Sequence, residues 1–226
     1  SGAADVLSAL GVNTDADFPV IKKAIWECNI GFLMATRHHS AMRHVAGPRV
    51  ELAVRTLFNL LGPISNPAGV KRQLTGVFDK KWITPIAQTL NQLGTERAWI
   101  MHGSDGTDEL TTTGITYVSE LNKGKIIEFE VHPSDANIPI AKIEDLKGRD
   151  PNYNAKAIID MLSGSASAYR NIVILNASAA LIVAGKVKTL REGCEYAAQA
   201  IDNGEAKRVL SRLVNMTNQD TYGENI

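Results

Sequence analysis

Residues 74–102, LTGVFDKKWITPIAQTLNQLGTERAWIMH, determine the fold class. The short apolar run Leu74 to Phe78 is typical of a buried strand, and Ala98 to His102 is a second run of this kind. Between them, apolar residues recur at helical spacing and Gly94 supplies a helix stop. A strand, a helix and a second strand in this order predict a protein of the α/β class.

Further strand and helix signals follow toward the C-terminus. The runs Thr116 to Leu121 and Lys125 to Val131 flank Asn122-Lys123-Gly124, which is a strong signal for a β-hairpin. The apolar stretch 172–184 predicts a buried helix, and the remaining chain to about residue 214 is helical in pattern. The class is therefore α/β with a large helical component.

Composition excludes several classes of protein. The 226 residues carry 24 Lys+Arg and 24 Asp+Glu, and 44% of them are hydrophobic, which argues against a disordered chain. No apolar run reaches the roughly 18 residues that a membrane helix requires. A neutral chain without clusters of Lys and Arg offers no electrostatic case for nucleic acid or a membrane surface as partner. Cys28 and Cys194 lie on apolar helical faces and are predicted to be buried thiols.

A basic stretch, RHHSAMRHVAGPR at residues 37–49, holds three histidines and three arginines. His39 and His44 are five residues apart, which disfavours the i, i+4 pairing of a zinc site. Two interpretations remain open. The stretch is either a solvated basic helix face or a site for an anion, in which the guanidinium fork of Arg49 would bind a carboxylate or phosphate.

An acidic stretch, DGTDELTTT at residues 105–113, directly follows the second predicted strand. Ligands of α/β proteins bind outside the carboxyl ends of strands, so this stretch occupies a place where a site is expected. Asp108 and Glu109 offer hard oxygen ligands of the kind that Mg²⁺ takes. The alternative is an exposed turn, because Asp-Gly is also an ordinary turn dipeptide.

Several motifs occur in order between residue 1 and about residue 214. They are SGAADVL (1–7), GFL (31–33), HSAM (39–42), PR (48–49), FNLLGP (58–63) with NP (66–67), HGSDGTDEL (102–110), NA (176–177) and AID (200–202) with Gly204. In this combination the chain resembles the anthranilate phosphoribosyltransferase family of tryptophan biosynthesis. The segments 58–67 and 102–110 are the most specific parts of the resemblance.

The resemblance implies an activity and a set of site residues. The family transfers the phosphoribosyl group of phosphoribosyl pyrophosphate to the amine of anthranilate, with Mg²⁺ on the phosphates. Matched by motif, Arg49 would hold the anthranilate carboxylate, Asp108 and Glu109 would bind Mg²⁺, and the backbone amide of Ala3 would bind the phosphoribosyl group. The anthranilate entrance would be shaped by His39, Met42, Gly62 and Pro63.

The resemblance also implies the architecture and the setting. We expect a central, mostly parallel sheet surrounded by helices, a few of them from a truncated helical domain. Residues 1–70 would supply helices and the anthranilate side, residues 71–214 the α/β phosphoribosyltransferase domain continuous with them, and residues 215–226 a mobile tail. The full-length protein is expected to be a cytoplasmic homodimer that binds neither nucleic acid nor membrane.

Three motifs of the family do not occur in the chain. They are its glycine-rich Gly-Thr-Gly-Gly-Asp loop, its Asn-x-Ser-Thr segment and its Lys-His-Gly-Asn segment. The chain is therefore expected to be a C-terminal portion with negligible turnover alone. Two other functions remain open: a pyrimidine-nucleoside phosphorylase of similar architecture, and a relative that has lost catalysis and binds nucleic acid.

Overall fold

The computed structural model describes residues 1–38, 62, 64–66 and 68–219. Their packing forms two compact units that interleave along the sequence. The first unit comprises residues 1–53, 148–165 and 200–226, and the second comprises residues 54–147 and 166–199. These boundaries differ from the expected division at residues 70 and 214. The expected division into domains stays a prediction.

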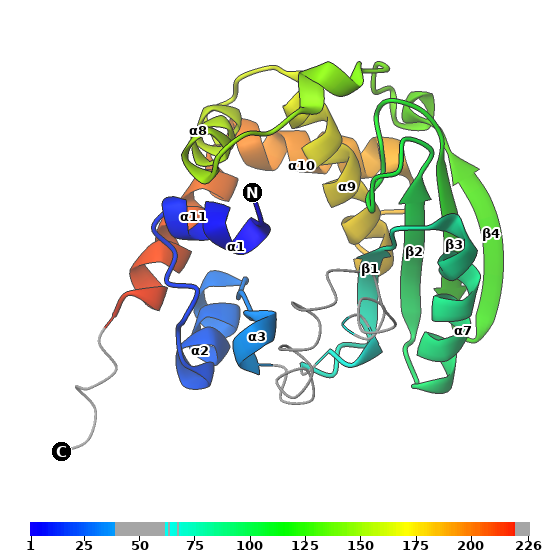
Figure 1. The fold of residues 1–226 in the computed structure, drawn as a ribbon, viewed down its shortest axis with the longest axis horizontal. Coiled ribbons are helices and arrows are strands. Elements are labelled where there is room, and N and C mark those ends of the chain that lie inside the picture. The colour runs from blue at the N-terminus through cyan, green and yellow to red at the C-terminus, as the bar shows by residue number, and fades with distance from the viewer. Residues whose placement is uncertain (39–61, 63, 67, 220–226) are drawn as a thin grey trace, which may run out of the picture. The chain divides into compact units, whose positions relative to one another are not determined.

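A four-stranded sheet forms the centre of the second unit (Figure 1). Its strands, in spatial order, are β1 (Arg72–Gly76), β2 (Arg97–Gly103), β3 (Thr116–Asn122) and β4 (Lys125–Val131). The expected α/β class is confirmed, but the described sheet is mixed rather than mostly parallel. Only β1 and β2 run parallel, because the loop after β2 and the hairpin at Lys123-Gly124 each reverse the chain within the sheet.

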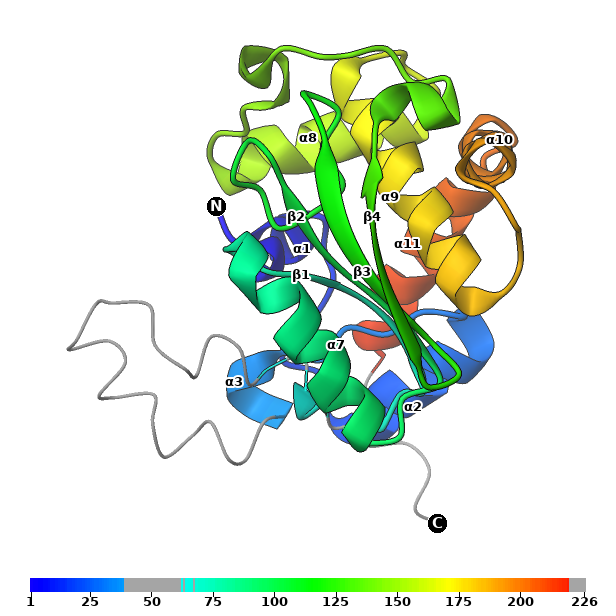
Figure 2. The same ribbon diagram turned by 90° about the vertical axis from the view of Figure 1, so that its right-hand side faces the viewer.

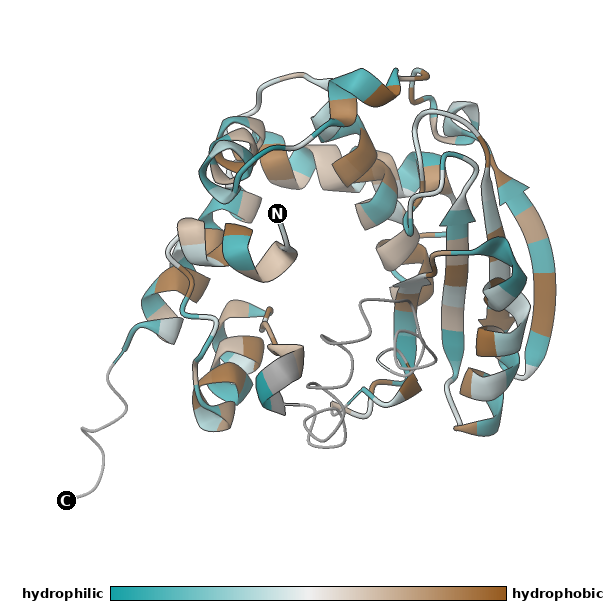
Figure 3. Cartoon of the chain, in the orientation of Figure 1, coloured by the Kyte–Doolittle hydropathy of each residue, from teal (hydrophilic) through white to brown (hydrophobic). Residues whose placement is uncertain are grey.

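Helices cover both faces of this sheet. Figure 2 shows α7 (Ile83–Gln92) on one face and α9 (Ala168–Ala184) on the other. Below α7 lies an apolar core of Val77, Ile83, Ile86, Ala87, Leu90, Ala98, Ile100 and Leu121. In Figure 3 the edge strand β4 alternates between hydrophilic and hydrophobic residues, as expected for a strand with two different faces.

Two contacts fix α9 against its neighbours. The Arg97 side chain, paired with Glu120 at 2.8 Å, donates from Nη1 to the carbonyl oxygen of Ile182 at 2.6 Å, so β2 is tied to the last turn of α9. On the other side, Ser178 Oγ donates to the carbonyl oxygen of Leu190 at 2.7 Å. A cation at a helix C-terminus is also favoured by the helix dipole.

The predicted buried helix at 172–184 is confirmed as part of α9. It begins at Ser167, whose hydroxyl accepts from the Arg170 N–H at 3.0 Å, and it ends at Gly185 with a φ of 75°. A serine cap and a glycine in the left-handed region are the usual signals for the two ends of a helix.

Five helices make up the described part of the first unit. They are α1 (Ala3–Ala9), α2 (Phe18–Cys28), α3 (Ala35–His38), α8 (Pro151–Leu162) and α11 (Glu205–Thr217). α2 packs on α11 around Val12, Ala24, Cys28, Leu213 and Met216, and α1 packs on α8. α11 extends three residues beyond the helix limit expected at residue 214. Its end is held because Thr217 Oγ1 accepts from the Asn13 N–H at 3.1 Å.

The remaining elements belong to the second unit or start in it. They are the 3₁₀ turns η1 (Lys80–Trp82), η2 (Pro133–Ala136) and η3 (Ile143–Leu146), and helix α10 (Leu190–Asp202). Cys28 and Cys194 are buried free thiols, as predicted. Along the described ranges, every helix is too short or too polar to cross a bilayer.

The loop between β2 and β3 is organised by Asp105. Its Oδ1 accepts from the backbone N–H of Thr107 at 3.1 Å and from the Thr107 hydroxyl at 2.7 Å. Its Oδ2 accepts from the hydroxyls of Thr111 at 2.6 Å and Thr113 at 2.7 Å. Partial burial alone would raise the pKa of Asp105, but these hydrogen bonds outweigh it and lower the pKa to about 2.

Asp105→Ala should destabilise the protein, because it removes all four acceptor contacts and leaves the buried Thr111 hydroxyl without that partner. The loop is partly exposed to water, so we expect a loss on the order of 1–2 kcal/mol at pH 7, measured by urea unfolding. A lowered pKa stabilises the fold above the unfolded value of 3.8, and this contribution is lost as the pH falls toward 2. The difference between wild type and variant should therefore narrow from pH 5 to pH 3.

Asp15→Ala is the control, because it removes an exposed carboxylate from the first unit. It should change the free energy of unfolding by less than about 0.5 kcal/mol at pH 7. Equal stability of Asp105→Ala and wild type at pH 7 would show that the threonine contacts do not stabilise the loop.

Candidate functional site

The carboxylates of Asp108 and Glu109 lie in the loop that follows β2, and both side chains are exposed. The loop backbone passes directly against the end of β1. A Cβ built on Gly76 would lie 1.4 Å from the carbonyl oxygen of Asp108, which no real atom can do. Gly76 is therefore required for the backbone of the acidic pair to approach β1 this closely.

The loop is also attached to α9 through Asn176. The backbone N–H of Leu110 donates to Asn176 Oδ1 at 2.9 Å, and Asn176 Nδ2 donates to the carbonyl oxygen of Leu110 at 2.8 Å. Asn176 Nδ2 also donates to the carbonyl oxygen of Ile172 at 3.0 Å. The sequence predicts Asn176 as a satisfied core amide in the helix; its hydrogen bonds confirm that the amide is satisfied, and its main partner is the loop.

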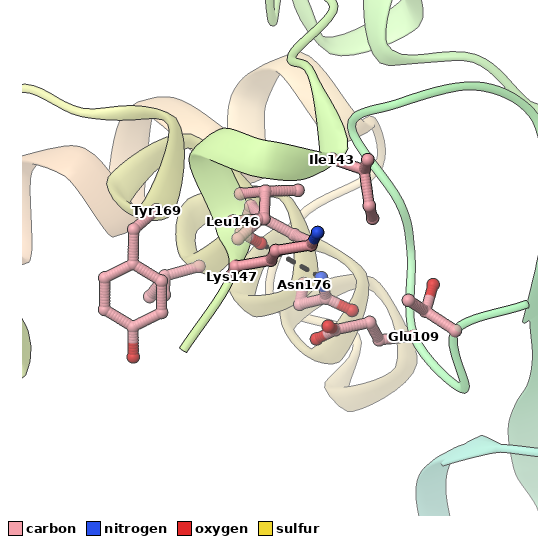
Figure 4. A pocket seen from close by; sticks show the side chains of 9 residues that line it. Glu109, Ile143, Leu146, Lys147, Tyr169 and Asn176 are labelled. Carbon is pink, nitrogen blue, oxygen red and sulfur yellow. Dashed lines mark hydrogen bonds between the residues drawn. The ribbon is translucent and has the colours of Figure 1, made fainter. Parts of the chain in front are cut away.

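A cavity of about 370 Å³ opens beside the acidic pair. It is lined by Thr107, Glu109, Ile143, Leu146, Lys147, Tyr169, Ile172, Val173 and Asn176 (Figure 4). Aliphatic side chains from η3 and α9 form one part of the wall. Glu109, Lys147 and Tyr169 add ionisable groups, so the cavity combines apolar surface with a few polar groups, as small-molecule sites usually do.

Charges around the cavity act on one another. Partial desolvation at the cavity wall raises the pKa of Glu109 although the residue is still open to solvent, and the neighbouring carboxylates of Asp108 and Asp105 raise it further. Burial also raises the pKa of the Tyr169 hydroxyl, with a smaller contribution from Glu109. A site in which negative charge is concentrated in this way is stabilised by a bound cation.

The donor set fits Mg²⁺ better than a tightly bound transition metal. Across the described residues, no three His, Cys, Asp or Glu side chains gather at one point. Mg²⁺ does not need such a set, because it usually takes one or two carboxylates together with water and substrate phosphate. Within the same ranges, the carboxylates of Asp108 and Glu109 form no hydrogen bond or ion pair, so their oxygens are free to bind a cation.

The other predicted site residues divide into three groups. His39, Met42, Arg49 and Pro63 lie outside the described residues. Gly62 is described, and a Cβ built on it would have no atom of another described residue within 4 Å. Ala3 is the first residue of α1 in the first unit, next to Gly2, whose N–H donates to the Asp5 carboxylate at 3.1 Å. The proposed role of the Ala3 amide stays a prediction.

Sequence reasoning missed three residues of this region. Lys147 and Tyr169 line the cavity, but neither belongs to a motif that would have marked it. Asp105 organises the loop through Thr107, and the Asp-x-Thr spacing, typical of a local side-chain turn, was a usable signal for this contact. Its contacts with Thr111 and Thr113 depend on the return of the loop, which the spacing does not reveal.

Comparison with known proteins gives one family model and many relatives. Residues 1–207 match the model described as "Glycosyl transferase family, a/b domain". An anthranilate phosphoribosyltransferase of Paramagnetospirillum magneticum is 57% identical over 97% of this chain, and one of Rhodospirillum rubrum is 54% identical over 95%. The chain spans 63% and 62% of the length of these two relatives, which is less than two thirds.

Solved structures show the same likeness. The crystal structure of an anthranilate phosphoribosyltransferase from Thermus thermophilus has a TM-score of 0.89 and 40% identity, covering 96% of this chain and 65% of that one. A Saccharomyces cerevisiae enzyme of the same name, in complex with PRPP and Mg, has a TM-score of 0.87 at 24% identity, over 96% of this chain and 62% of that one. The second likeness concerns the fold. The chain thus belongs to the glycosyl transferase family with this a/b domain, and within it is similar to anthranilate phosphoribosyltransferases.

Proposed function

We propose that the full-length protein, to which this chain contributes the α/β portion, transfers the phosphoribosyl group of phosphoribosyl pyrophosphate to the amine of anthranilate, with Mg²⁺ as cofactor. The observation that carries this proposal is the acidic pair Asp108 and Glu109, exposed at the carboxyl end of β2 beside a cavity. The identity of 57% with a relative of that name supports the choice of reaction. The Mg²⁺ in a yeast relative of similar fold supports the choice of cofactor.

In this reaction the amine nitrogen forms a bond to C1 of the ribose while the bond from C1 to the pyrophosphate oxygen breaks. The amine then loses a proton to solvent. Since positive charge develops on the ribose and negative charge on the leaving group, alignment and charge neutralisation accelerate the step more than a protein nucleophile would. Asp108 and Glu109 would hold Mg²⁺, which neutralises charge on the pyrophosphate when bound.

The remaining assignments are part of the same proposal. Arg49 would bind the anthranilate carboxylate, His39, Met42, Gly62 and Pro63 would line its entrance, and the Ala3 amide would bind the phosphoribosyl group. A location in the cytoplasm and a homodimeric full-length protein remain predictions. No observation favours the phosphorylase or the nucleic-acid-binding alternative, and the equal numbers of acidic and basic residues argue against the second.

Replacement of both acidic residues, Asp108→Asn with Glu109→Gln, should weaken Mg²⁺ binding. Amides keep the size of the side chains but remove the charge that a hard divalent cation requires. Titration calorimetry with Mg²⁺ in the presence of phosphoribosyl pyrophosphate should show a dissociation constant raised by about tenfold or more.

The matched control removes two carboxylates elsewhere in the second unit. Glu128→Gln with Glu130→Gln on β4 changes the net charge by the same amount and leaves the loop intact. Its Mg²⁺ titration should coincide with that of wild type. If the Asp108 and Glu109 double variant also coincides with wild type, the two residues do not belong to the metal site.

Arg49→Ala in the full-length protein should weaken anthranilate binding, because the carboxylate loses a charged, planar hydrogen-bond partner. The expected loss is about 1.5–3 kcal/mol, measured from the fluorescence of anthranilate in an equilibrium titration. Arg208→Ala is the control, since that guanidinium is exposed on α11 and pairs with Glu205. An anthranilate affinity that is the same in Arg49→Ala and wild type would contradict the assignment.

A further inference from the structure

The side-chain amide of Asn176 lies in the middle of the most apolar helix of the second unit, with Ile172, Leu175 and Ala179 buried near it in the sequence. An asparagine is a poor helix former, and a half-buried amide such as that of Asn176 is costly unless it is hydrogen-bonded. Among the described residues, the amide bonds to one residue outside α9, Leu110, through both the N–H and the carbonyl oxygen of that residue.

Leu110 directly follows Glu109, so a pair of hydrogen bonds on its backbone restricts the position and orientation of the acidic pair. The two bonds hold the peptide units on either side of the Leu110 Cα, so they restrict rotation of the backbone there more than a single bond would. The third bond of Asn176, to Ile172 within α9, holds the amide plane in the orientation that Leu110 needs.

The acidic loop needs such restraint because its carboxylates repel one another. The charged carboxylate of Asp105 is stabilised by its hydrogen bonds with threonines, and it fixes the loop upstream of the pair. Gly76 allows close contact at Asp108 itself. Downstream of the pair, Asn176 provides the hydrogen-bonded connection to α9. Without that connection, repulsion between the carboxylates of Asp108 and Glu109 would be free to separate them.

We propose that Asn176 is a positioning residue, which holds the backbone at Leu110 so that Asp108 and Glu109 bind one divalent cation together. This inference rests on the proposed function for the role of the pair. It adds to that function a residue on α9 that does not touch the cation. Outer contacts of this kind commonly change metal affinity by about 10- to 100-fold.

Asn176→Ala in the full-length protein tests the proposal, with Mn²⁺ as the probe. Binding of Mn²⁺ in the presence of phosphoribosyl pyrophosphate is followed by the electron paramagnetic resonance signal of the free ion. We expect the dissociation constant to rise about tenfold. Asn176→Leu keeps the γ-branched shape and the packing of α9, so it should give the same rise even if the alanine variant is less stable.

Ser178→Ala is the matched control. It removes one buried hydrogen bond of α9, the one to Leu190, on the part of the helix that does not contact the loop. It should lower the melting temperature and leave the Mn²⁺ dissociation constant within about twofold of wild type. A purely structural role of Asn176 would instead make its variants resemble Ser178→Ala in both measurements.

Each result has one meaning. If wild type binds Mn²⁺ and folded Asn176→Ala or Asn176→Leu binds it equally well, the positioning role is wrong and the proposed function stands. If wild type shows no Mn²⁺ binding, the proposed function fails at its metal site and the positioning role fails with it. A tenfold loss in the Asn176 variants alone supports the inference.

Discussion

The structure of the site depends on how the repulsion among three carboxylates, which lie within five residues of one loop, is contained. Asp105, Asp108 and Glu109 would repel one another if all were free, and a flexible loop would move them apart. The structure commits Asp105 to four hydrogen bonds from Thr107, Thr111 and Thr113. The carboxylate of Asp105 thereby stabilises the loop, and those of Asp108 and Glu109 stay accessible to solvent. Local hydrogen bonding thus determines which carboxylate stabilises the loop and which two remain available for a ligand.

The loop is supported from three directions by elements that pack together within the second unit. Its own threonines surround Asp105, the end of β1 lies against the Asp108 backbone, and α9 holds Leu110 through Asn176. α9 can serve this purpose because it is fixed at its other end, where Arg97 of β2 binds the carbonyl oxygen of Ile182. Helix and strand are therefore connected both near the start of β2 and beyond its end.

Much of this fold could be predicted from the sequence because its signals are local. Asn122-Lys123-Gly124 predicts the hairpin of β3 and β4, and Gly94 predicts a helix end that the structure confirms. The mixed character of the sheet was harder to predict, since the alternation of strands and helices from residue 74 to residue 102 is also what a parallel sheet produces. The direction of β3 depends on the path of a loop that has no regular periodicity.

In the candidate site, too, contacts between residues far apart in the sequence could not be predicted for single side chains. Sequence reasoning selected Asp108 and Glu109 as cation ligands, and of the three carboxylates in this loop these are the two that form no hydrogen bond or ion pair with a described residue. It did not separate Asp105 from them by any physical criterion, and it described Asn176 without its partner. The contact between Asn176 and Leu110 joins residues 66 positions apart, so it follows only from the packing of α9 on the sheet.

The arrangement also bears on how a cation would be bound. A site that recruits only two carboxylates holds Mg²⁺ weakly by itself, because the ion keeps several waters and is reluctant to lose them. The affinity for Mg²⁺ then increases when a substrate supplies phosphate oxygens. The binding of the cation and the binding of the substrate would therefore strengthen each other. A rigid loop favours this coupling, because the two carboxylates need no rearrangement when the phosphates arrive and the energy of binding is not used to order them. Restraint of Leu110 by Asn176 is, on this reasoning, a contribution to substrate binding made by a residue that contacts neither substrate nor metal.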